Sequence, residues 1–112
     1  LAAALTIRAG LVGRTEATAR GALYCIRTAI QKQGGRLDGT RIAIQGFGNV
    51  GSNLARLSAE EGVRVVALSD SQGGVANPYG IDVRAAIAHK AEHGELKGLP
   101  GTEEINEAEL VE

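Results

Sequence analysis

Three glycines, Gly46, Gly48 and Gly51, stand in the spacing G-x-G-x-x-G within the segment Gln45-Gly-Phe-Gly-Asn-Val-Gly51. Each can do a separate job where a strand turns into a helix. The first allows a tight turn, the second lets the backbone approach a ligand, and the third lets the helix pack closely on the strand. A helix that begins here offers free N–H groups and a partial positive charge to an anion. These residues therefore favour the binding of phosphate groups.

The segments on either side of the glycines strengthen this interpretation. The apolar segment Arg41–Gln45 precedes them, a helical pattern follows, and a second apolar segment, Val63–Leu68, leads to Asp70. An acidic residue about 20 positions after the last glycine can accept hydrogen bonds from ribose hydroxyls in dinucleotide-binding βαβ units. No Gly-Lys-Ser/Thr follows, which argues against a mononucleotide P-loop. We predict a dinucleotide-binding turn; the alternative is a glycine-rich turn without a ligand.

Asp70 also bears on which dinucleotide would bind. A carboxylate at this place can accept hydrogen bonds from both ribose hydroxyls of NAD, and it would repel the 2′-phosphate of NADP. No Arg or Lys occurs between Ser69 and Ile81, and Arg64 starts the same strand, roughly 16 Å away. We expect NAD as the cofactor. NADP stays open, since a cation from elsewhere in the fold could reach the phosphate.

Three helices are expected. The first covers residues 15–33, with Thr15 as its cap and Gly34-Gly35 as its end. The second follows the glycines and ends at Gly62. Asp82 should cap the third, which ends near His93-Gly94. We expect a turn-rich loop over 69–80 and an acidic, irregular segment after 94, in which 106–111 could form one helical turn.

Two parallel strands joined by a helix make one right-handed βαβ unit, so we predict an α/β fold of the Rossmann type. None of the residues up to Glu112 supplies an obvious third parallel strand. We therefore expect a dinucleotide-binding unit truncated before its parallel sheet is complete. The chain begins at Leu1, and we expect a piece of a longer protein. Residues 1–14 are assigned to a lead-in from the interdomain region, and 15–112 to a partial dinucleotide-binding domain.

The composition is that of an ordinary globular domain and excludes some classes of function. The chain has 112 residues, a net charge of −1 and 44% hydrophobic residues. The charge balance gives no reason to expect nucleic acid or an anionic membrane as a partner. No apolar run approaches the roughly 20 residues of a membrane span. Cys25 is the single cysteine; it fits a reducing, cytoplasmic location, and we expect it to be buried.

Three segments resemble the signature motifs of the hexameric glutamate dehydrogenases, in the order of that family. Gly10-Leu-Val-Gly-Arg-Thr-Glu-Ala-Thr-Ala-Arg-Gly21 is similar to G-S-x-G-R-x-x-A-T-G-R-G. The segment Gln45–Gly51 matches the family's fingerprint, and Ser69–Asn77, with Gly80-Ile-Asp82 after it, matches a third motif. Leucine and phenylalanine dehydrogenases share the fingerprint but typically lack the G-R-x-x-A-T block. The resemblance therefore favours glutamate dehydrogenase.

The chain departs from the family pattern at three positions. Leu11 stands in place of a small residue, Ala19 in place of a glycine, and Ala76 in place of an aromatic residue. Ala19 falls inside the first expected helix, where alanine is the better helix former. We expect the fold to tolerate this change.

The resemblance implies a cofactor site along the three motifs. Thr18 is similar to the threonine that contacts the nicotinamide end, Asn49 to a fingerprint asparagine at the cofactor, and Arg14 to a motif arginine near the cleft. From the residues alone, Thr18 can equally be a first-turn residue bonded to its own backbone. The residues implied to bind the cofactor are Arg14, Thr18, Gly46, Phe47, Gly48, Asn49, Val50, Gly51, Asp70 and Ser71.

The resemblance also implies the activity of a full-length parent. Such an enzyme oxidatively deaminates L-glutamate to 2-oxoglutarate and ammonia, passes the hydride to NAD(P)⁺ and assembles as a homo-hexamer. Its catalytic lysine and aspartate lie in a preceding substrate domain, so we expect no catalytic residue here. Lys32, Lys90 and Lys97 are expected to be solvated. The alternatives are a leucine, valine or phenylalanine dehydrogenase, and a non-catalytic NAD-sensing module.

One further pattern is a poor match to its usual chemistry. His89-Lys-Ala-Glu-His93 fits the zinc-protease pattern H-x-x-E-H. A catalytic zinc has three protein ligands, and the chain contains no other histidine. We expect no metal site.

Overall fold

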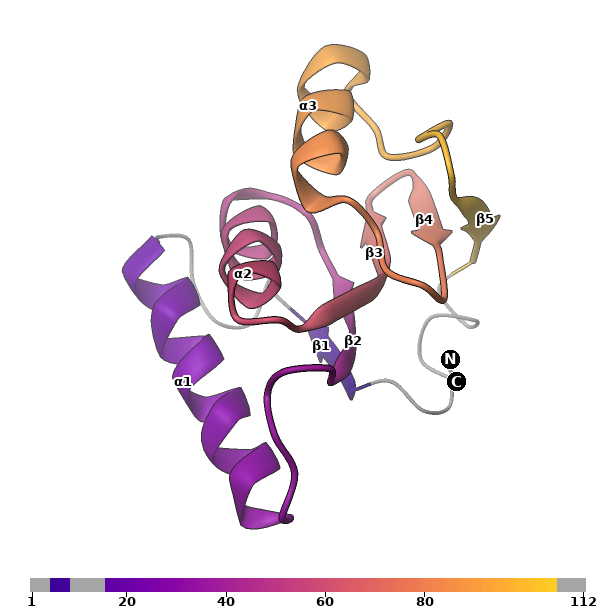
Figure 1. Cartoon of the computed structure of the whole chain (residues 1–112). Coiled ribbons are helices and arrows are strands. Elements are labelled where there is room, and N and C mark those ends of the chain that lie inside the picture. Colours follow the sequence, from indigo (N-terminus) through magenta and orange to yellow (C-terminus); the bar gives the residue numbers. More distant parts are fainter. Residues whose placement is uncertain (1–4, 9–15, 107–112) are drawn as a thin grey trace.

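The computed structural model describes residues 5–8 and 16–106, with the side chains of the first helix described from Ala19 onward. This part of the chain forms three helices and five strands (Figure 1). In chain order they are β1 (Leu5–Arg8), α1 (Glu16–Lys32), β2 (Arg41–Gln45), α2 (Asn49–Glu60), β3 (Arg64–Asp70), β4 (Gly73–Ala76), α3 (Val83–His93) and β5 (Glu103–Ile105).

The five strands form one sheet in the order β1-β2-β3-β4-β5. Strands β1, β2 and β3 run parallel, whereas β4 is antiparallel to β3 and β5 is antiparallel to β4. Each parallel connection carries a helix, and α1 lies beside α2 in Figure 1. The predicted α/β fold of the Rossmann type is confirmed.

The sheet is larger than the sequence predicted. Residues 5–8, which we assigned to the lead-in, form a third parallel strand, and β4 lies within the expected loop over 69–80. Strand β5 occupies part of the segment expected to be irregular. These strands have only four, four and three residues, which is too short for a clear hydrophobic period. Tertiary pairing with their neighbours specifies them instead. The helical turn expected over 106–111 lies, apart from Asn106, outside the described residues.

The helix predictions hold closely. Helix α1 covers Glu16–Lys32, and Gly34 follows it with a φ of 81°, a left-handed value that favours glycine. Asp82 caps α3: its Oδ1 accepts a hydrogen bond from the Ala85 N–H at 3.1 Å. Gly94 ends the same helix with its N–H on the Lys90 carbonyl at 2.8 Å. The proposed cap at Thr15 lies outside the described residues.

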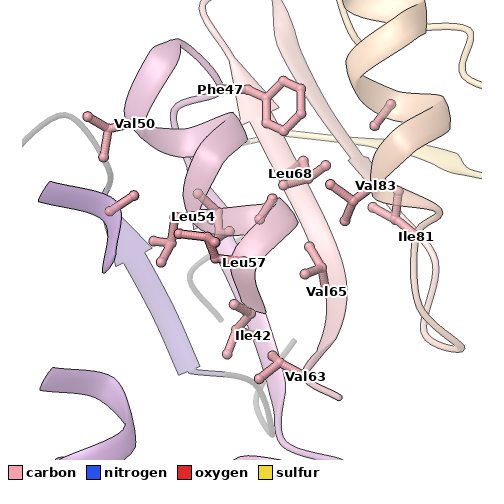
Figure 2. Close-up of a cluster of buried hydrophobic side chains, with 14 of the residues drawn as sticks. Ile42, Phe47, Val50, Leu54, Leu57, Val63, Val65, Leu68, Ile81 and Val83 are labelled. Atoms are coloured by element: carbon pink, nitrogen blue, oxygen red, sulfur yellow. The ribbon is translucent and has the colours of Figure 1, made fainter. Parts of the chain in front are cut away.

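The main core lies between one face of the sheet and the helices. Figure 2 shows side chains from β2, β3, α2 and the start of α3 meeting in this cluster. Buried residues of all three helices belong to it, for example Leu23, Leu54 and Val83. Burying one such side chain stabilises the fold by about 1.5–3 kcal/mol. A smaller cluster, Ala43, Ala67 and Ala76, lies apart from this core. Cys25 is exposed, so the prediction that it is buried is wrong.

Candidate functional site

The glycine turn joins the end of β2 to the start of α2. Gly46 has a φ of 104°, which L side chains rarely adopt. Its N–H donates a hydrogen bond to the Ser69 carbonyl at 2.9 Å. This bond ties the glycine turn to the end of β3. The two regions that the sequence predicted to bind a dinucleotide therefore lie together, at the carboxyl edge of two adjacent parallel strands.

The start of α2 is uncapped. Gly48 is the N-cap residue, it makes no side-chain cap, and the first turn contains no acidic residue. The first helical bond runs from the Ser52 N–H to the Gly48 carbonyl at 2.9 Å. The N–H groups of Asn49, Val50 and Gly51 precede that bond and have no acceptor within the helix. This geometry, together with the helix dipole, suits an anion.

There is open space at the turn. A Cβ atom placed on Gly48 would meet nothing within 4 Å, and both Gly48 and Asn49 are exposed. Phe47 and Val50, in contrast, point into the core, with 4% of each residue exposed (Figure 2). Only the main chain of these two residues can face a ligand. A phosphate group could approach the backbone here without displacing a side chain.

The end of β3 is arranged differently. The side chain of Asp70 is 2% exposed, and its carboxylate faces four donors. Oδ1 accepts hydrogen bonds from the N–H groups of Gln72 and Gly73 at 2.8 and 3.1 Å. Oδ2 accepts hydrogen bonds from Lys90 Nζ at 2.9 Å and from the Leu96 N–H at 2.8 Å. The carboxylate that we expected to hold a ribose is turned toward the protein's own groups.

These contacts fix the charge of Asp70. Burial acts to raise the pKa of the Asp70 carboxyl, but the hydrogen bond from Lys90, the backbone N–H groups and the Lys90 charge outweigh it and lower the pKa. Asp70 is therefore ionised at neutral pH and paired with Lys90. We expected Lys90 to be solvated, and this is wrong: its side chain is 28% exposed and ends on Asp70. A cation on α3 does reach the carboxylate.

The turn after Asp70 also contains a residue that the sequence reasoning missed. Gly73 has a φ of 146°, and a Cβ added to it would lie 2.6 Å from Lys97 Cε. Ser71, which precedes this crowded position, is exposed. The consecutive glycines Gly73 and Gly74 were the available signal, because a positive φ strongly favours glycine.

Two predicted residues cannot be placed in the site. Arg14 lies outside the described residues. Thr18 lies in the first turn of α1, and its side chain is likewise outside the description. Their expected contacts with the cofactor stay predictions.

The histidine pair on α3 is close, with ring centroids 4.4 Å apart. His89 Nε2 is already hydrogen-bonded to the Lys97 carbonyl at 2.9 Å. Over residues 5–8 and 16–106, no three His, Cys, Asp or Glu side chains come together in a group that could hold a metal ion. None of the helices described here is both long and apolar enough to span a membrane.

The fold and the glycine turn are those of a nucleotide-binding unit in a dehydrogenase family. The profile of the Glutamate/Leucine/Phenylalanine/Valine dehydrogenases matches residues 9–112. This chain belongs to that family.

Three solved structures are similar to the chain. A hetero-hexameric glutamate dehydrogenase from Thermus thermophilus in its leucine-bound form is 35% identical, with a TM-score of 0.71, over 79% of this chain and 21% of that one. Glutamate dehydrogenase from Peptoniphilus asaccharolyticus is 30% identical, with a TM-score of 0.65, over 75% and 22%. A further glutamate dehydrogenase is 27% identical, with a TM-score of 0.69, over 83% and 24%. The chain thus spans less than a quarter of the length of these proteins.

Proposed function

We propose that this chain is the cofactor-binding part of an NAD(P)-dependent glutamate dehydrogenase. The full-length enzyme would oxidatively deaminate L-glutamate to 2-oxoglutarate and ammonia. The observation that carries the proposal is the uncapped, open start of α2 at Gly48, in a chain of this family. Thr18 is proposed to contact the nicotinamide end of the cofactor, and Arg14 is proposed to lie near the cleft. We take residues 15–112 as part of the dinucleotide-binding domain.

The residues of the turn fit a pyrophosphate. Gly48 lets the backbone approach, and the N–H groups of Asn49, Val50 and Gly51 can donate to phosphate oxygens. The exposed side chain of Asn49 can add a further hydrogen bond. A bound nicotinamide dinucleotide supplies the hydride acceptor, while the protein supplies binding and orientation.

The choice between NAD and NADP depends on the end of β3. An unpaired carboxylate there would disfavour a 2′-phosphate by roughly 1–3 kcal/mol at an intermediate dielectric. Lys90 neutralises much of that charge, since its ammonium lies 2.9 Å from Asp70 Oδ2. We propose NAD as the cofactor, with a weaker discrimination against NADP than an unpaired aspartate would give.

The wider assignments rest on the family and on composition. We propose that the parent is a hexamer, because one similar structure is described as hetero-hexameric. That its subunits are identical is proposed from the sequence resemblance alone. L-Glutamate is proposed as the substrate because all three similar structures are glutamate dehydrogenases. A cytoplasmic location is proposed from the single cysteine.

Substitution of Gly48 in the full-length enzyme tests the proposal. The Gly48→Val variant places a side chain in the open space at the turn, so we expect the Kd for NAD to rise at least tenfold. Calorimetric titration measures this affinity. Ala59→Val is the control, because Ala59 is exposed in the last turn of α2, at the opposite end of that helix from the glycine turn. Unchanged NAD affinity in Gly48→Val would mean that the turn does not bind the pyrophosphate.

A further inference from the structure

We propose that the amino edge of the sheet carries a second anion site, in which Arg41 and Arg64 bind a phosphate group. Arg41 is the first residue of β2, and Arg64 is the first residue of β3. The glycine turn follows the opposite end of β2, so a strand of five residues, roughly 16 Å long, separates the two places. The site is therefore distinct from the dinucleotide site and does not depend on the proposed function.

The two arginines start neighbouring strands side by side. Arg41 and Arg64 are Cα partners in the parallel pairing of β2 with β3, and adjacent strands lie about 4.8 Å apart. The residues that follow them, Ile42 and Val65, belong to the main core. Because successive side chains alternate between the two faces of a sheet, both arginines project from the face opposite that core.

Neither guanidinium group has an anionic partner. Over residues 5–8 and 16–106, the side chains of Arg41 and Arg64 form no ion pair and no hydrogen bond. The Nε atom of Arg41 is buried without an acceptor, which costs free energy. Like charges on paired residues of adjacent strands also repel. An anion between the two side chains would satisfy the donors and remove the repulsion.

A surface hollow of about 380 Å³ opens beside Arg64. Its lining comes from the start of β3 and from the connection between β4 and α3, and it includes Tyr79, Gly80 and Asp82. A water molecule takes up roughly 30 Å³ in the liquid, so the hollow has room for a phosphate group. Tyr79 is 86% exposed, and its hydroxyl can donate a hydrogen bond to an oxyanion.

The stem of Arg64 is fixed beside this hollow. The connection from β4 to α3 is tied to β3, because the Ile81 N–H donates a hydrogen bond to the Val65 carbonyl at 2.7 Å. Gly80, in the same connection, has a φ of 109°, and a Cβ added to it would lie 3.0 Å from Arg64 Cγ. The absence of a side chain at Gly80 thus leaves the space that the arginine stem occupies.

Two carboxylates lie near the hollow without neutralising the arginines. Asp82 is part of the lining, but its Oδ1 caps α3 by accepting a backbone N–H at 3.1 Å. Asp38 lies against Gly62, another residue of the lining. Within the described part of the chain, neither carboxylate forms an ion pair with Arg41 or Arg64. Their charges disfavour an anion larger than one phosphate group.

The chemistry of the pair indicates the class of ligand. Guanidinium groups donate two parallel hydrogen bonds to the oxygens of a phosphate or a carboxylate. A phosphomonoester carries a charge of about −1.5 to −2 at pH 7, which two arginines match better than they match a single carboxylate. We therefore assign the site to one phosphate group, either free or as part of a phosphomonoester.

Calorimetric titration of the full-length enzyme with inorganic phosphate, at constant ionic strength, tests the site. Arg41→Gln/Arg64→Gln should raise the Kd for phosphate about tenfold or more, and Tyr79→Phe about twofold. Arg41→Lys/Arg64→Lys keeps both charges but loses the planar donors, so we expect a rise of about threefold. Lys32→Gln is the control, because it removes a cation exposed in the last turn of α1, and it should leave the Kd unchanged.

Two further titrations locate the site and identify the source of the phosphate. Phosphate should bind equally well with and without saturating NAD, whereas binding that NAD abolishes would place it at the glycine turn and overturn the proposal. Titration with glycerol 3-phosphate separates the two sources. Tighter binding than that of inorganic phosphate supports a phosphomonoester ligand, and equal or weaker binding supports free phosphate.

Thermal unfolding of the same enzymes gives a second, independent measurement. Without phosphate, Arg41→Gln/Arg64→Gln should have the same Tm as the unmodified enzyme or a higher one, because it removes two unpartnered like charges. Phosphate should raise the Tm of the unmodified enzyme more than that of the variant. Equal phosphate affinity in the two would overturn the proposal. A lower Tm of the variant without any effect of phosphate would also overturn it, since the arginines would then bond another part of the full-length protein.

Discussion

The two turns at the carboxyl edge of the sheet follow adjacent parallel strands, and they differ in how their polar groups are satisfied. At the β2–α2 turn, the first N–H groups of α2 have no acceptor in the helix and no side-chain cap. At the β3–β4 turn, the Asp70 carboxylate takes four donors from the protein. One main-chain bond, from Gly46 to Ser69, joins the two. The first turn is open to a ligand, whereas the second is closed on itself.

The two turns have different roles: the β2–α2 turn can bind a ligand, and the β3–β4 turn stabilises the structure beside it. Unpaired N–H groups at a helix start cost stability until an anion or water satisfies them. A buried carboxylate with all its acceptor positions filled contributes stability and holds its neighbours in one geometry. At this edge of the sheet, the unpaired N–H groups that can bind a ligand follow β2. The Asp70 carboxylate, which holds the neighbouring backbone in place and is called the anchor below, lies at the end of β3. The strong sequence motif marks the open turn, and the anchor depends on residues that are distant in sequence.

The largest expected effect comes from removing the anchor. Asp70→Ala would leave Lys90 Nζ and three backbone N–H groups without their acceptor, and breaking a partly buried ion pair in this way costs about 3 kcal/mol. Urea unfolding of the chain, monitored by circular dichroism, measures the change in the free energy of unfolding. Asp82→Ala, which removes an N-cap, should cost about 1 kcal/mol. Equal losses of unfolding free energy in the two variants would contradict the conclusion that the Asp70 carboxylate stabilises the fold more than an ordinary helix cap does.

Alanine at one glycine of each turn sharpens the comparison. Gly73→Ala forces a Cβ into a φ of 146°, while the exposed Lys97 side chain beside it can move aside, and from the backbone strain we expect a loss of about 2 kcal/mol. Gly48→Ala meets open space at a φ of −86°, so its loss should stay near 1 kcal/mol or below, from the poorer N-cap. The same unfolding measurement separates them. A larger loss at Gly48 than at Gly73 would reverse the assignment of open and closed turns.

Acid should weaken the closed turn specifically. The pKa of Asp70 is lowered in the folded state, and an unfolded aspartate titrates near 3.9. Its contribution is therefore fully present above about pH 4 and is lost as the pH falls through the folded-state pKa. Unfolding measured between pH 7 and pH 3 should show the stability difference between the unmodified chain and Asp70→Asn/Lys90→Met shrinking as the pH falls. Parallel pH profiles would contradict this.

The same contrast explains what the sequence could predict. Short local patterns predicted the glycine turn, strand β2 and the cap at Asp82, because each of these features depends on residues within a few positions of one another. The pairing of Asp70 with Lys90 joins residues 20 positions apart, and no local period indicates it. Strand β1 pairs with a partner 37 positions away, as in Arg8 opposite Gln45. It is too short to show a hydrophobic period from which a strand could be predicted. Local chemistry predicted the open turn, and only the fold showed how the other is closed.

The smallest effect is expected at Ser69, where the two turns meet. Its Oγ is buried and has no hydrogen-bond partner, while its main-chain carbonyl accepts the bond from Gly46. Ser69→Ala removes the unsatisfied hydroxyl and keeps the carbonyl, so we expect unfolding free energy to stay equal or to rise by up to about 1 kcal/mol. NAD affinity of the full-length enzyme should not change. If Ser69→Ala instead weakens NAD binding several-fold, the buried hydroxyl takes part in the site. Ser69 would then belong to the open, ligand-binding turn through its side chain and not only through its main-chain carbonyl.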